Sequence, residues 1–399
     1  MKKILFIISG SVSAYKSLDL LKNLIKDKFD IKVILTKSGA KFLTPLSLSS
    51  LINKEVHTDI FSKKNSINHM EHINLTRNSD LVVVCPASAN IIAKLANGYA
   101  DDLASTTLAA SNKKIFLVPS MNKKMWENPA NKKNIKELKL RGIKIIGPIK
   151  GSLACGEIGL GKMEDIKIIK KEIKNFFILK KNIKGKKILI TAGPTIEPID
   201  PVRYISNFSS GKQGYEIANC AYTYGAKTIL ITGPTNIEPP EVDKLIKVES
   251  AEQMFYESMN ICKKYCSIDI AFLTAAVSDW KINKMKKKYK KKENIFKQII
   301  FRENKDILHM VSNLKKNRPK IVCGFAAETN SLIKNARHKL INKNCDFIFA
   351  NKISNKFNPM GNDFNKISVI GKNNQKNWSK MTKKKIAEKI IQEVSLYVN

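Results

Sequence analysis

The chain has 399 residues, enough for two or three domains with separate hydrophobic cores. Lysine and arginine number 71 against 34 aspartate and glutamate residues, which gives a formal net charge of +37. Only six of the basic residues are arginine, the side chain that nucleic-acid surfaces favour, and lysines are spread over every segment. The charge therefore favours anionic small-molecule substrates over a dedicated nucleic-acid surface.

The sequence predicts neither a membrane protein nor a secreted one. No stretch reaches the ~18 consecutive apolar residues of a transmembrane helix. The apolar run at residues 4–8 is shorter than the ~7–15 residues of a secretory signal. The seven cysteines are odd in number and lack framework spacing, so we expect reduced thiols and a cytoplasmic location.

The first half alternates between apolar strands and helical periodicity. Strands are predicted at residues 3–8, 31–36, 80–85, 115–119 and 143–146. Amphipathic helices are predicted between them, including residues 15–28 and 91–96. Because strand, helix and strand follow one another, we expect a doubly wound parallel sheet of the α/β class.

Small polar residues follow these strands, at Ser11, Thr36, Ser38, Ser88, Asn90, Ser120 and Asn122. The carboxyl ends of parallel strands meet at one edge of a sheet, where open α/β folds bind ligands. The turn after the first strand suits a phosphate at a helix start, although it is no G-x-G-x-x-G fingerprint. For any single one of these residues the alternative is a helix N-cap.

Two further features of the first half carry reactive side chains. Residues 151–163 are rich in glycine and hold one cysteine, Cys155, so they can form a flap that folds over a ligand. The alternative is a flexible loop with a buried, inert cysteine. His72 is one of five histidines, and its alternative is a structural role.

Several motifs in this half resemble the flavin-dependent cysteine decarboxylases, specifically phosphopantothenoylcysteine decarboxylase. They are Ser9-Gly-Ser-Val-Ser-Ala-Tyr-Lys16, Pro86-Ala-Ser-Ala-Asn90, Pro119-Ser-Met-Asn-Lys-Lys-Met-Trp126 and Leu153-Ala-Cys-Gly156. Two positions depart from the family pattern: Ser120 stands where alanine is usual, and Lys162 where arginine is common.

The resemblance implies a flavodoxin-like FMN domain over residues 1–181. It implies that Cys155 donates a proton, that Asn122 binds the substrate carboxylate and that His72 orients the substrate. In this family the flavin takes a hydride from the substrate cysteine, CO2 leaves, and the hydride is returned. The residues implied to hold FMN are Gly10, Ser11, Val12, Thr36, Ser38, Ser88, Ala89, Asn90 and Ser120.

The strand and helix pattern restarts after an amphipathic helix at 164–181 and a lysine-rich boundary at 182–185. Strands are predicted at 188–191, 228–232, 269–274, 321–325 and 346–350, and helices at 215–224, 332–342 and 381–397. We therefore expect a second Rossmann-like, parallel-sheet domain over residues 182–399. Its Ser209-Ser-Gly-Lys212 segment is no P-loop, because the first glycine is missing and Gln213 replaces the Ser/Thr that binds Mg2+. The segment remains a glycine-rich loop at a helix start, which suits a phosphate.

Motifs of the second half resemble phosphopantothenate–cysteine ligase. They are Thr191-Ala-Gly-Pro-Thr195, Asp200-Pro-Val-Arg-Tyr-Ile-Ser-Asn207, Ala275-Ala-Val and Gly324-Phe-Ala-Ala-Glu-Thr329. The resemblance implies CTP and Mg2+, an acyl-cytidylate formed on 4′-phosphopantothenate, and displacement of CMP by the cysteine amine. The residues implied to bind substrates are Asn207, Asp279, Lys288, Lys305, Asp306, Ile307, Leu308, Phe325, Lys339 and Lys343.

Two departures affect the ligase assignment. Lys305 replaces the proline of the family's Asn-Pro-Asp-Ile, so a preset turn is lost. Two segments, 284–287 and 288–291, match the family's Lys-Ile-Lys-Lys, which leaves Lys288 and Lys284 as alternatives; such a lysine run is also typical of a solvated loop.

Together the two resemblances cover nearly the whole chain and imply a bifunctional enzyme of coenzyme A biosynthesis. Its expected partners are phosphopantothenate, cysteine, CTP and 4′-phosphopantothenoylcysteine, with no nucleic acid and no membrane. The resemblance also implies trimers of the first domain and dimers of the second, joined into a dodecamer. Two alternatives stay open: a decarboxylase with a non-functional ligase-like module, and a basic nucleic-acid-binding protein.

Overall fold

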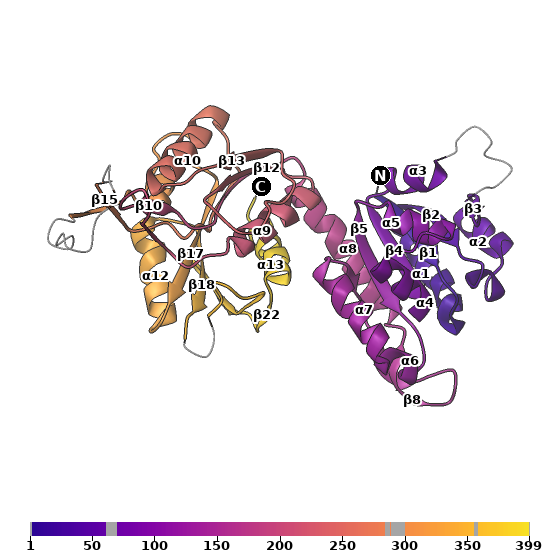
Figure 1. Cartoon of the computed structure of the whole chain (residues 1–399). Helices are drawn as coiled ribbons and strands as arrows, with labels where there is room; N and C mark the ends of the chain where they lie inside the picture. The colour runs from indigo at the N-terminus through magenta and orange to yellow at the C-terminus, as the bar shows by residue number, and fades with distance from the viewer. Residues whose placement is uncertain (1, 61–69, 284–287, 289–299, 355–357, 399) are drawn as a thin grey trace. The chain divides into compact units, whose positions relative to one another are not determined.

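The computed structural model describes residues 2–60, 70–283, 288, 300–354 and 358–398. It divides into two compact units, Met1–Phe177 and Ile178–Asn399, each with its own main sheet (Figure 1). The dividing point lies inside helix α8 (Ile166–Ile183), whereas the sequence indicated a boundary between residues 181 and 182.

The first unit is built on a six-stranded sheet in the order β3-β2-β1-β4-β5-β6, in which every neighbouring pair is parallel. Its strands are β1 (Lys2–Ile8), β2 (Phe29–Leu35), β3 (Val56–His57), β4 (Leu81–Ala87), β5 (Lys114–Pro119) and β6 (Lys144–Ile145). The strand β3 was not predicted, because two residues are too few to show alternation. The strand order reverses between β1 and β4, so the carboxyl ends of these strands mark the expected ligand edge.

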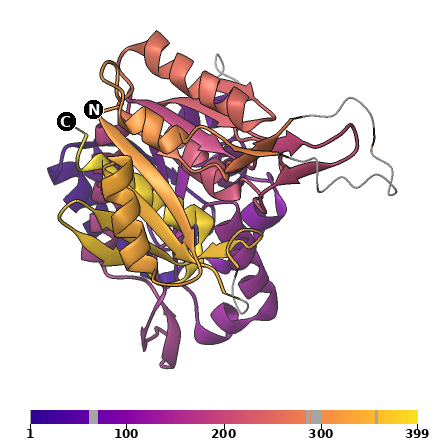
Figure 2. The same cartoon turned by 90° about the vertical axis from the view of Figure 1, so that its left-hand side faces the viewer.

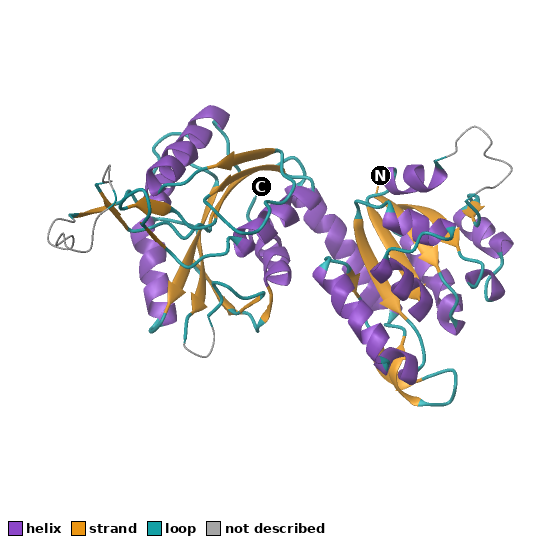
Figure 3. Cartoon of the chain, viewed as in Figure 1, coloured by secondary structure: helices purple, strands orange, loops and turns teal. Residues whose placement is uncertain are grey.

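Helices cover both faces of this sheet (Figure 3). They are α1 (Tyr15–Lys26), α2 (Pro45–Ile52), α3 (Glu71–Arg77), α4 (Ala89–Asn97), α5 (Leu103–Ala109), α6 (Lys123–Glu127), α7 (Pro129–Leu140) and α8, with 3-10 turns η1 (Val12–Ala14) and η2 (Gly39–Lys41). The helix α8 packs through aromatic contacts: the ring centroids of Phe176 and Phe116 lie 5.9 Å apart, and those of Phe177 and Phe29 lie 5.1 Å apart. Burial of these large rings is the main force holding the helix on the sheet.

The glycine-rich segment forms an antiparallel hairpin of β7 (Ile149–Ser152) and β8 (Ile158–Lys162), with Cys155 in the connecting turn. The sequence predicted a flap but not these strands, because glycine is depleted in strands generally. The structure requires glycine at one of these positions, Gly161. Its φ is 147°, and a Cβ there would lie 2.2 Å from the carbonyl oxygen of Met121, so only glycine allows the hairpin to approach this closely.

The second unit contains an eight-stranded sheet in the order β13-β12-β9-β14-β17-β18-β20-β21. Its strands are β9 (Lys187–Ala192), β12 (Lys227–Thr232), β13 (Lys244–Lys247), β14 (Ile270–Leu273), β17 (Ile321–Glu328), β18 (Phe347–Lys352), β20 (Ile367–Gly371) and β21 (Gln375–Asn377). The strands from β13 to β18 are parallel, but β20 and β21 are antiparallel additions at one edge. The expectation of a wholly parallel sheet was therefore wrong at this edge. The described residues between β18 and β20 form no crossover helix, and a parallel neighbour requires one.

Five helices pack on the second sheet: α9 (Lys212–Thr223), α10 (Ala251–Tyr265), α11 (Ile307–Ser312), α12 (Leu332–Lys343) and α13 (Lys383–Ser395). Residues of α10, α11 and α12 share one hydrophobic core with one face of the sheet. The helices α9 and α13 pack against each other on the opposite face (Figure 1). The carboxyl edge of this sheet is therefore reached by helices from both sides.

Three small two-stranded sheets complete the second unit. They pair β10 (Ile196–Pro198) with β11 (Tyr204–Ser206), β15 (Trp280–Ile282) with β16 (Phe301–Glu303), and β19 (Phe364–Asn365) with β22 (Met381–Thr382). The first two project away from the main sheet (Figures 1 and 2). None of the helices in the described part of the chain combines the length and apolar character of a membrane span.

Candidate functional sites

Serine hydroxyls tie three strand ends together at the carboxyl edge of the first sheet. Ser11 Oγ donates to Ser120 Oγ at 3.2 Å, and Ser120 Oγ donates to Ser13 Oγ at 2.9 Å. Ser9 Oγ donates to the carbonyl oxygen of Pro86 at 2.8 Å and accepts from the N–H of Ser88 at 2.9 Å. The turns after β1, β4 and β5 therefore form one connected polar surface at the strand-order reversal.

The turn after β2 reaches the same surface. A Cβ on Gly10 would lie 2.5 Å from Ser38 Cβ, so the turns after β1 and β2 touch and glycine is required between them. Thr36 Oγ1 accepts from the N–H of Gly39 at 3.0 Å, which fixes the second turn. Val12 is exposed at the start of η1, where the N–H groups of Ser13 and Ala14 donate to Ser11.

The N-cap alternative holds for three of the predicted site residues, and one of them is Ser11, whose Oγ accepts from the N–H of Ser13 at the start of η1. Ser88 Oγ accepts from the N–H of Ile91 at the start of α4, which also carries Ala89 and the exposed Asn90. Asn122 Oδ1 accepts from the N–H of Met125 at 2.8 Å at the start of α6. Capping uses only the oxygen of Asn122, so its amide nitrogen remains a donor for a ligand.

The hairpin that carries Cys155 is anchored beside Asn122. The N–H of Met121 donates to the carbonyl oxygen of Gly161 at 3.1 Å, and the side chain of Lys123 packs against Gly159. Cys155 itself is exposed at the tip. By contrast, burial raises the pKa of the Cys85 thiol to about 12, which is typical of an unreactive structural cysteine.

His72 lies half-buried on the short helix α3. Its neighbour Glu71 forms an ion pair with Nδ1 of His57 at the end of β3, which ties the start of α3 to the sheet edge. No hydrogen bond within the described residues links His72 to Asn122 or Cys155.

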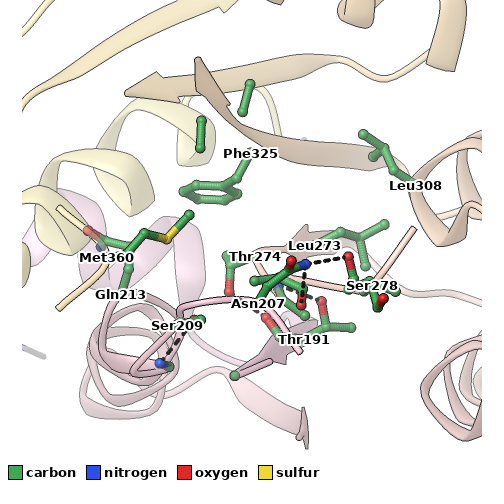
Figure 4. A pocket seen from close by; sticks show the side chains of 18 of the residues that line it. Thr191, Asn207, Ser209, Gln213, Leu273, Thr274, Ser278, Leu308, Phe325 and Met360 are labelled. Atoms are coloured by element: carbon green, nitrogen blue, oxygen red, sulfur yellow. Dashed lines mark hydrogen bonds between the residues drawn. The ribbon is translucent and has the colours of Figure 1, made fainter. Parts of the chain in front are cut away.

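The second unit has a pocket of about 860 Å³ at the carboxyl edge of its sheet (Figure 4). Asn207 points into it, and its Nδ2 donates to the carbonyl oxygens of Ala276 and Val277 at 3.3 and 2.9 Å. Asn207 thereby holds the loop that follows β14, while its own carbonyl oxygen stays available to a ligand. The N–H of Ser278, in the same loop, donates to Thr195 Oγ1 at 2.9 Å.

Asp306 and Lys343 form an ion pair in the pocket lining next to α12. Asp306 caps α11, where its Oδ1 accepts from the N–H of His309 at 2.7 Å, and its Oδ2 lies 2.6 Å from Lys343 Nζ. Burial alone would raise the pKa of Asp306, but the hydrogen bond from His309 and the Lys343 ammonium hold it below the usual value. Lys339 Nζ donates to the carbonyl oxygen of Phe325 at 3.2 Å.

Residues 1–178 match the family described as Flavoprotein, and residues 183–397 match the DNA/pantothenate metabolism flavoprotein C-terminal domain. The chain is 38% identical over 395 residues to the coenzyme A biosynthesis bifunctional protein CoaBC of Haemophilus influenzae, covering 98% of this chain and 97% of that protein. Its identity to CoaBC of Bacillus subtilis is 36% over 398 residues, covering 99% and 97%. The chain belongs to the family of coenzyme A biosynthesis bifunctional proteins.

Solved structures match each half separately. The crystal structure of the C-terminal domain of CoaBC is 34% identical and covers 54% of this chain and 97% of that chain, with a TM-score of 0.45. A PPC decarboxylase mutant complexed with pantothenoylaminoethenethiol is 32% identical and covers 44% and 98%, with a TM-score of 0.40.

As a member of this family, the chain is an enzyme with decarboxylase and ligase activities in coenzyme A biosynthesis. Its first unit is a flavoprotein domain of the FMN-dependent kind. The surface built by Gly10, Ser11 and Ser120 is compatible with that cofactor, because it is polar and lies at the carboxyl edge of the sheet, where open α/β folds bind ligands.

Nine of the ten predicted ligase residues line the single pocket described above: Asn207, Asp279, Lys305, Asp306, Ile307, Leu308, Phe325, Lys339 and Lys343. Lys288 is exposed and does not line it, and its alternative, Lys284, lies outside the described residues. Lys305, the departure from the family pattern, lies over the rings of Phe255 and Tyr256 with its Nζ 4.7 and 5.3 Å from their centroids. A cation–π contact therefore anchors the segment where proline is usual.

The pocket also contains Lys212 and Gln213, from the loop predicted to suit a phosphate, and two residues that the sequence did not single out, Asn351 and Lys383. The lysines could not be distinguished because lysine is spread over every segment of this chain. In the described ranges no group of three or more His, Cys, Asp and Glu side chains is placed to hold a metal ion. The exposed carboxylates of Asp279 and Glu303 also line this pocket.

Proposed function

We propose that this chain ligates cysteine to 4′-phosphopantothenate at the expense of CTP and then decarboxylates 4′-phosphopantothenoylcysteine to 4′-phosphopantetheine. The observation that carries the ligase half is the convergence of nine predicted residues, drawn from motifs between residues 207 and 343, on one pocket. The pocket lies at the carboxyl edge of the sheet, where open α/β folds bind their ligands.

In the ligase step, the phosphopantothenate carboxylate attacks the α-phosphate of CTP. An acyl-cytidylate forms and pyrophosphate leaves. The ammonium groups of Lys339 and Lys343 stabilise charge on the leaving pyrophosphate, because they are fixed in advance by Phe325 and Asp306. Asn207 offers its carbonyl oxygen to the intermediate, and the cysteine amine then displaces CMP.

Magnesium enters this site with the nucleotide in our proposal. Mg2+ commonly uses one or two protein carboxylates, with phosphate oxygens and waters as its other ligands. Asp279 supplies such a carboxylate, whereas both oxygens of Asp306 are occupied by His309 and Lys343.

In the decarboxylase step, FMN would supply a reversible hydride acceptor for the substrate cysteine. The turns at Gly10–Val12 and at Thr36, Ser38, Ser88–Asn90 and Ser120 would hold the cofactor. The Nδ2 group of Asn122 binds the substrate carboxylate, since its Oδ1 is committed to capping α6. His72 orients the substrate, and Cys155 on the exposed hairpin tip delivers the final proton.

We propose that the protein is a cytoplasmic homo-oligomer, with the first units forming trimers and the second units forming dimers, as the family resemblance implies. The separate positions of His72 and Cys155, with no direct hydrogen bond between them, agree with a site that is completed by its ligand and by neighbouring copies.

The decisive experiment is a coupled assay on the purified full-length protein. The protein should carry flavin absorbance, release pyrophosphate only when CTP, phosphopantothenate and cysteine are all present, and accumulate 4′-phosphopantetheine. Flavin absorbance and decarboxylation of supplied 4′-phosphopantothenoylcysteine, without any CTP-dependent pyrophosphate release, would instead leave the second unit as a non-functional module.

A further inference from the structure

His72, which orients the substrate in the proposed decarboxylase step, lies in the first turn of α3. The N-cap residue of this helix, Met70, is 60% exposed, and its side chain makes no capping hydrogen bond. The buried residues of α3 are Leu75 and Thr76, which both belong to its second half. The position of His72 therefore depends on what holds the start of the helix.

A contact from outside the helix reaches this turn through Glu71, the first residue of α3 and the neighbour of His72. Nδ1 of His57 forms an ion pair with Glu71 Oε1, and the two side chains are largely buried, with exposed fractions of 18% and 13%. Because an ionised carboxylate only accepts hydrogen bonds, Nδ1 carries the hydrogen and donates it. A neutral imidazole can make this bond as well as a charged one.

His57 is a fixed point for this contact because it belongs to the main sheet of the first unit. It is the last residue of β3, and it pairs in parallel register with Ile34 of β2. Ile34 is buried in the core, and Thr36, at the start of the turn proposed to hold FMN, follows two residues later. The His57–Glu71 bond thus joins the helix of His72 to the strands that end beside the cofactor turn.

Loss of this bond would displace the first turn of α3. A largely buried carboxylate without a partner is unfavourable, so Glu71 would move toward water and carry the start of the helix with it. His72 is the next residue and would move as well. A displacement of about 1 Å in a positioning group is enough to lower a reaction rate ~100-fold. The second half of the helix, which Leu75 holds in the core, would stay in place.

We propose that His57 is a positioning residue of the decarboxylase. Its hydrogen bond to Glu71 fixes the first turn of α3 and thereby places the side chain of His72 for the substrate. His57 touches neither substrate nor cofactor in this scheme and takes no part in bond making or breaking. The inference rests on the role of His72 in the proposed function, and it adds two residues that the family motifs do not contain.

The first test compares His57→Leu with wild type in the full-length, flavin-loaded protein. We expect kcat for decarboxylation of supplied 4′-phosphopantothenoylcysteine to fall at least ~10-fold, because the orienting group is displaced. Flavin affinity and the ligase rate of the second unit, which serve as internal controls, should be unchanged. The matched variant is His57→Asn, whose amide nitrogen can still donate to Glu71 and should restore most of the rate. Equal losses in the two variants would overturn the proposal.

A double-mutant cycle shows whether the effect of His57 passes through His72. In a His72→Asn background, His57→Leu should change the residual kcat by no more than about twofold, because the side chain to be positioned is gone. A further loss as large as in the wild-type background would overturn the proposal. Glu71→Leu breaks the same bond without leaving a buried carboxylate, and it replaces His57→Leu in every comparison if that variant does not fold.

Amide hydrogen exchange of residues 71–77 tests the anchoring of α3 without turnover. Exchange there should be faster in His57→Leu than in wild type and His57→Asn, while exchange in α4 should be the same in all three. Equal exchange of residues 71–77 in wild type and His57→Leu would overturn the proposal. A wild-type protein that does not decarboxylate, together with faster exchange in His57→Leu, would contradict the proposed function and still support the anchoring of α3 by His57.

Discussion

Several polar residues of this chain serve local structure and a ligand at once. Asn122 caps α6 with its oxygen and retains two N–H donors, and Asn207 holds the loop after β14 with its nitrogen and retains its oxygen. One asparagine side chain can therefore stabilise local structure and also bind a ligand, because an amide has separate donor and acceptor atoms. Cys155 differs, since its exposed position at the hairpin tip serves no packing purpose.

Cys155→Ser tests the proton donor. The variant should release CO2 from 4′-phosphopantothenoylcysteine at a rate within a few-fold of wild type, but it should form 4′-phosphopantetheine at least ~100-fold more slowly, in line with the effect of losing a general acid. Product chromatography and flavin absorbance report the two steps. Cys266→Ser, which changes the exposed cysteine of the second unit, is the matched control. Normal 4′-phosphopantetheine formation by Cys155→Ser would assign the proton to another group.

The pKa of Lys383, a buried residue at the start of α13, predicts a pH dependence of stability. Burial lowers this pKa to about 8, and the Lys212 ammonium adds to the effect, while Asp363 and Glu216 oppose it. With a folded pKa of about 8, the ammonium is charged at pH 7 and mostly neutral at pH 9.

The folded pKa lies below the ordinary lysine value of 10.5, so between these two values the unfolded chain binds more protons than the folded one. The contribution of Lys383 to the free energy of unfolding therefore increases as pH rises from about 8 toward 10.5. Lys383→Met lacks this contribution, so its free energy of unfolding relative to wild type should fall over the same range. Denaturant unfolding at several pH values measures the difference; a difference that does not change with pH would show that Lys383 does not titrate in this range.

Among the elements of the first unit, the β7–β8 hairpin is one that a single substitution can displace. The hairpin approaches α6 so closely that Gly161 has no room for a side chain, and its backbone bond to Met121 fixes the base. The exposed apolar side chains of Ile158 and Leu160 are consistent with a segment that covers a ligand or a neighbouring copy and does not fill a core.

Gly161→Ala should separate the hairpin from α6. The new Cβ would lie 2.2 Å from the Met121 carbonyl oxygen, so the strand must move. We expect decarboxylase activity to fall at least ~10-fold, because displacement of a positioning segment by about 1 Å is enough for such a loss. The ligase activity of the second unit should be unchanged. Gly98→Ala is the control, since it also has positive φ but open space around it; equal losses in both variants would attribute the effect to backbone strain alone.

For the whole molecule, the two units are separate folds in one chain, with separate main sheets and separate sites. The ligase pocket is lined only by residues between 191 and 383, and the serine cluster of the first unit only by residues before 121. Nothing in either described site requires a side chain from the other unit.

Residues 1–181 and 182–399 should therefore each keep an activity when produced separately. The first fragment should bind flavin and decarboxylate supplied 4′-phosphopantothenoylcysteine, and the second should release pyrophosphate with CTP, phosphopantothenate and cysteine. Both should unfold cooperatively in calorimetry. If a fragment is folded but inactive until the other is added, its site depends on the partner half.

The local pattern could be predicted from the amino-acid sequence: buried strands alternate with amphipathic helices, as is typical of an α/β fold, and short motifs mark the strand ends. It did not predict β3, the hairpin strands of β7 and β8, or the antiparallel β20 and β21. Pairing partners decide those strands, and two residues or a glycine-rich run carry too little periodicity. The ligase motifs were readable one by one, but their convergence on a single pocket was decided by the tertiary structure. So was the burial of Lys383, because a lysine's environment depends on which helices pack around it and not on its neighbours in sequence.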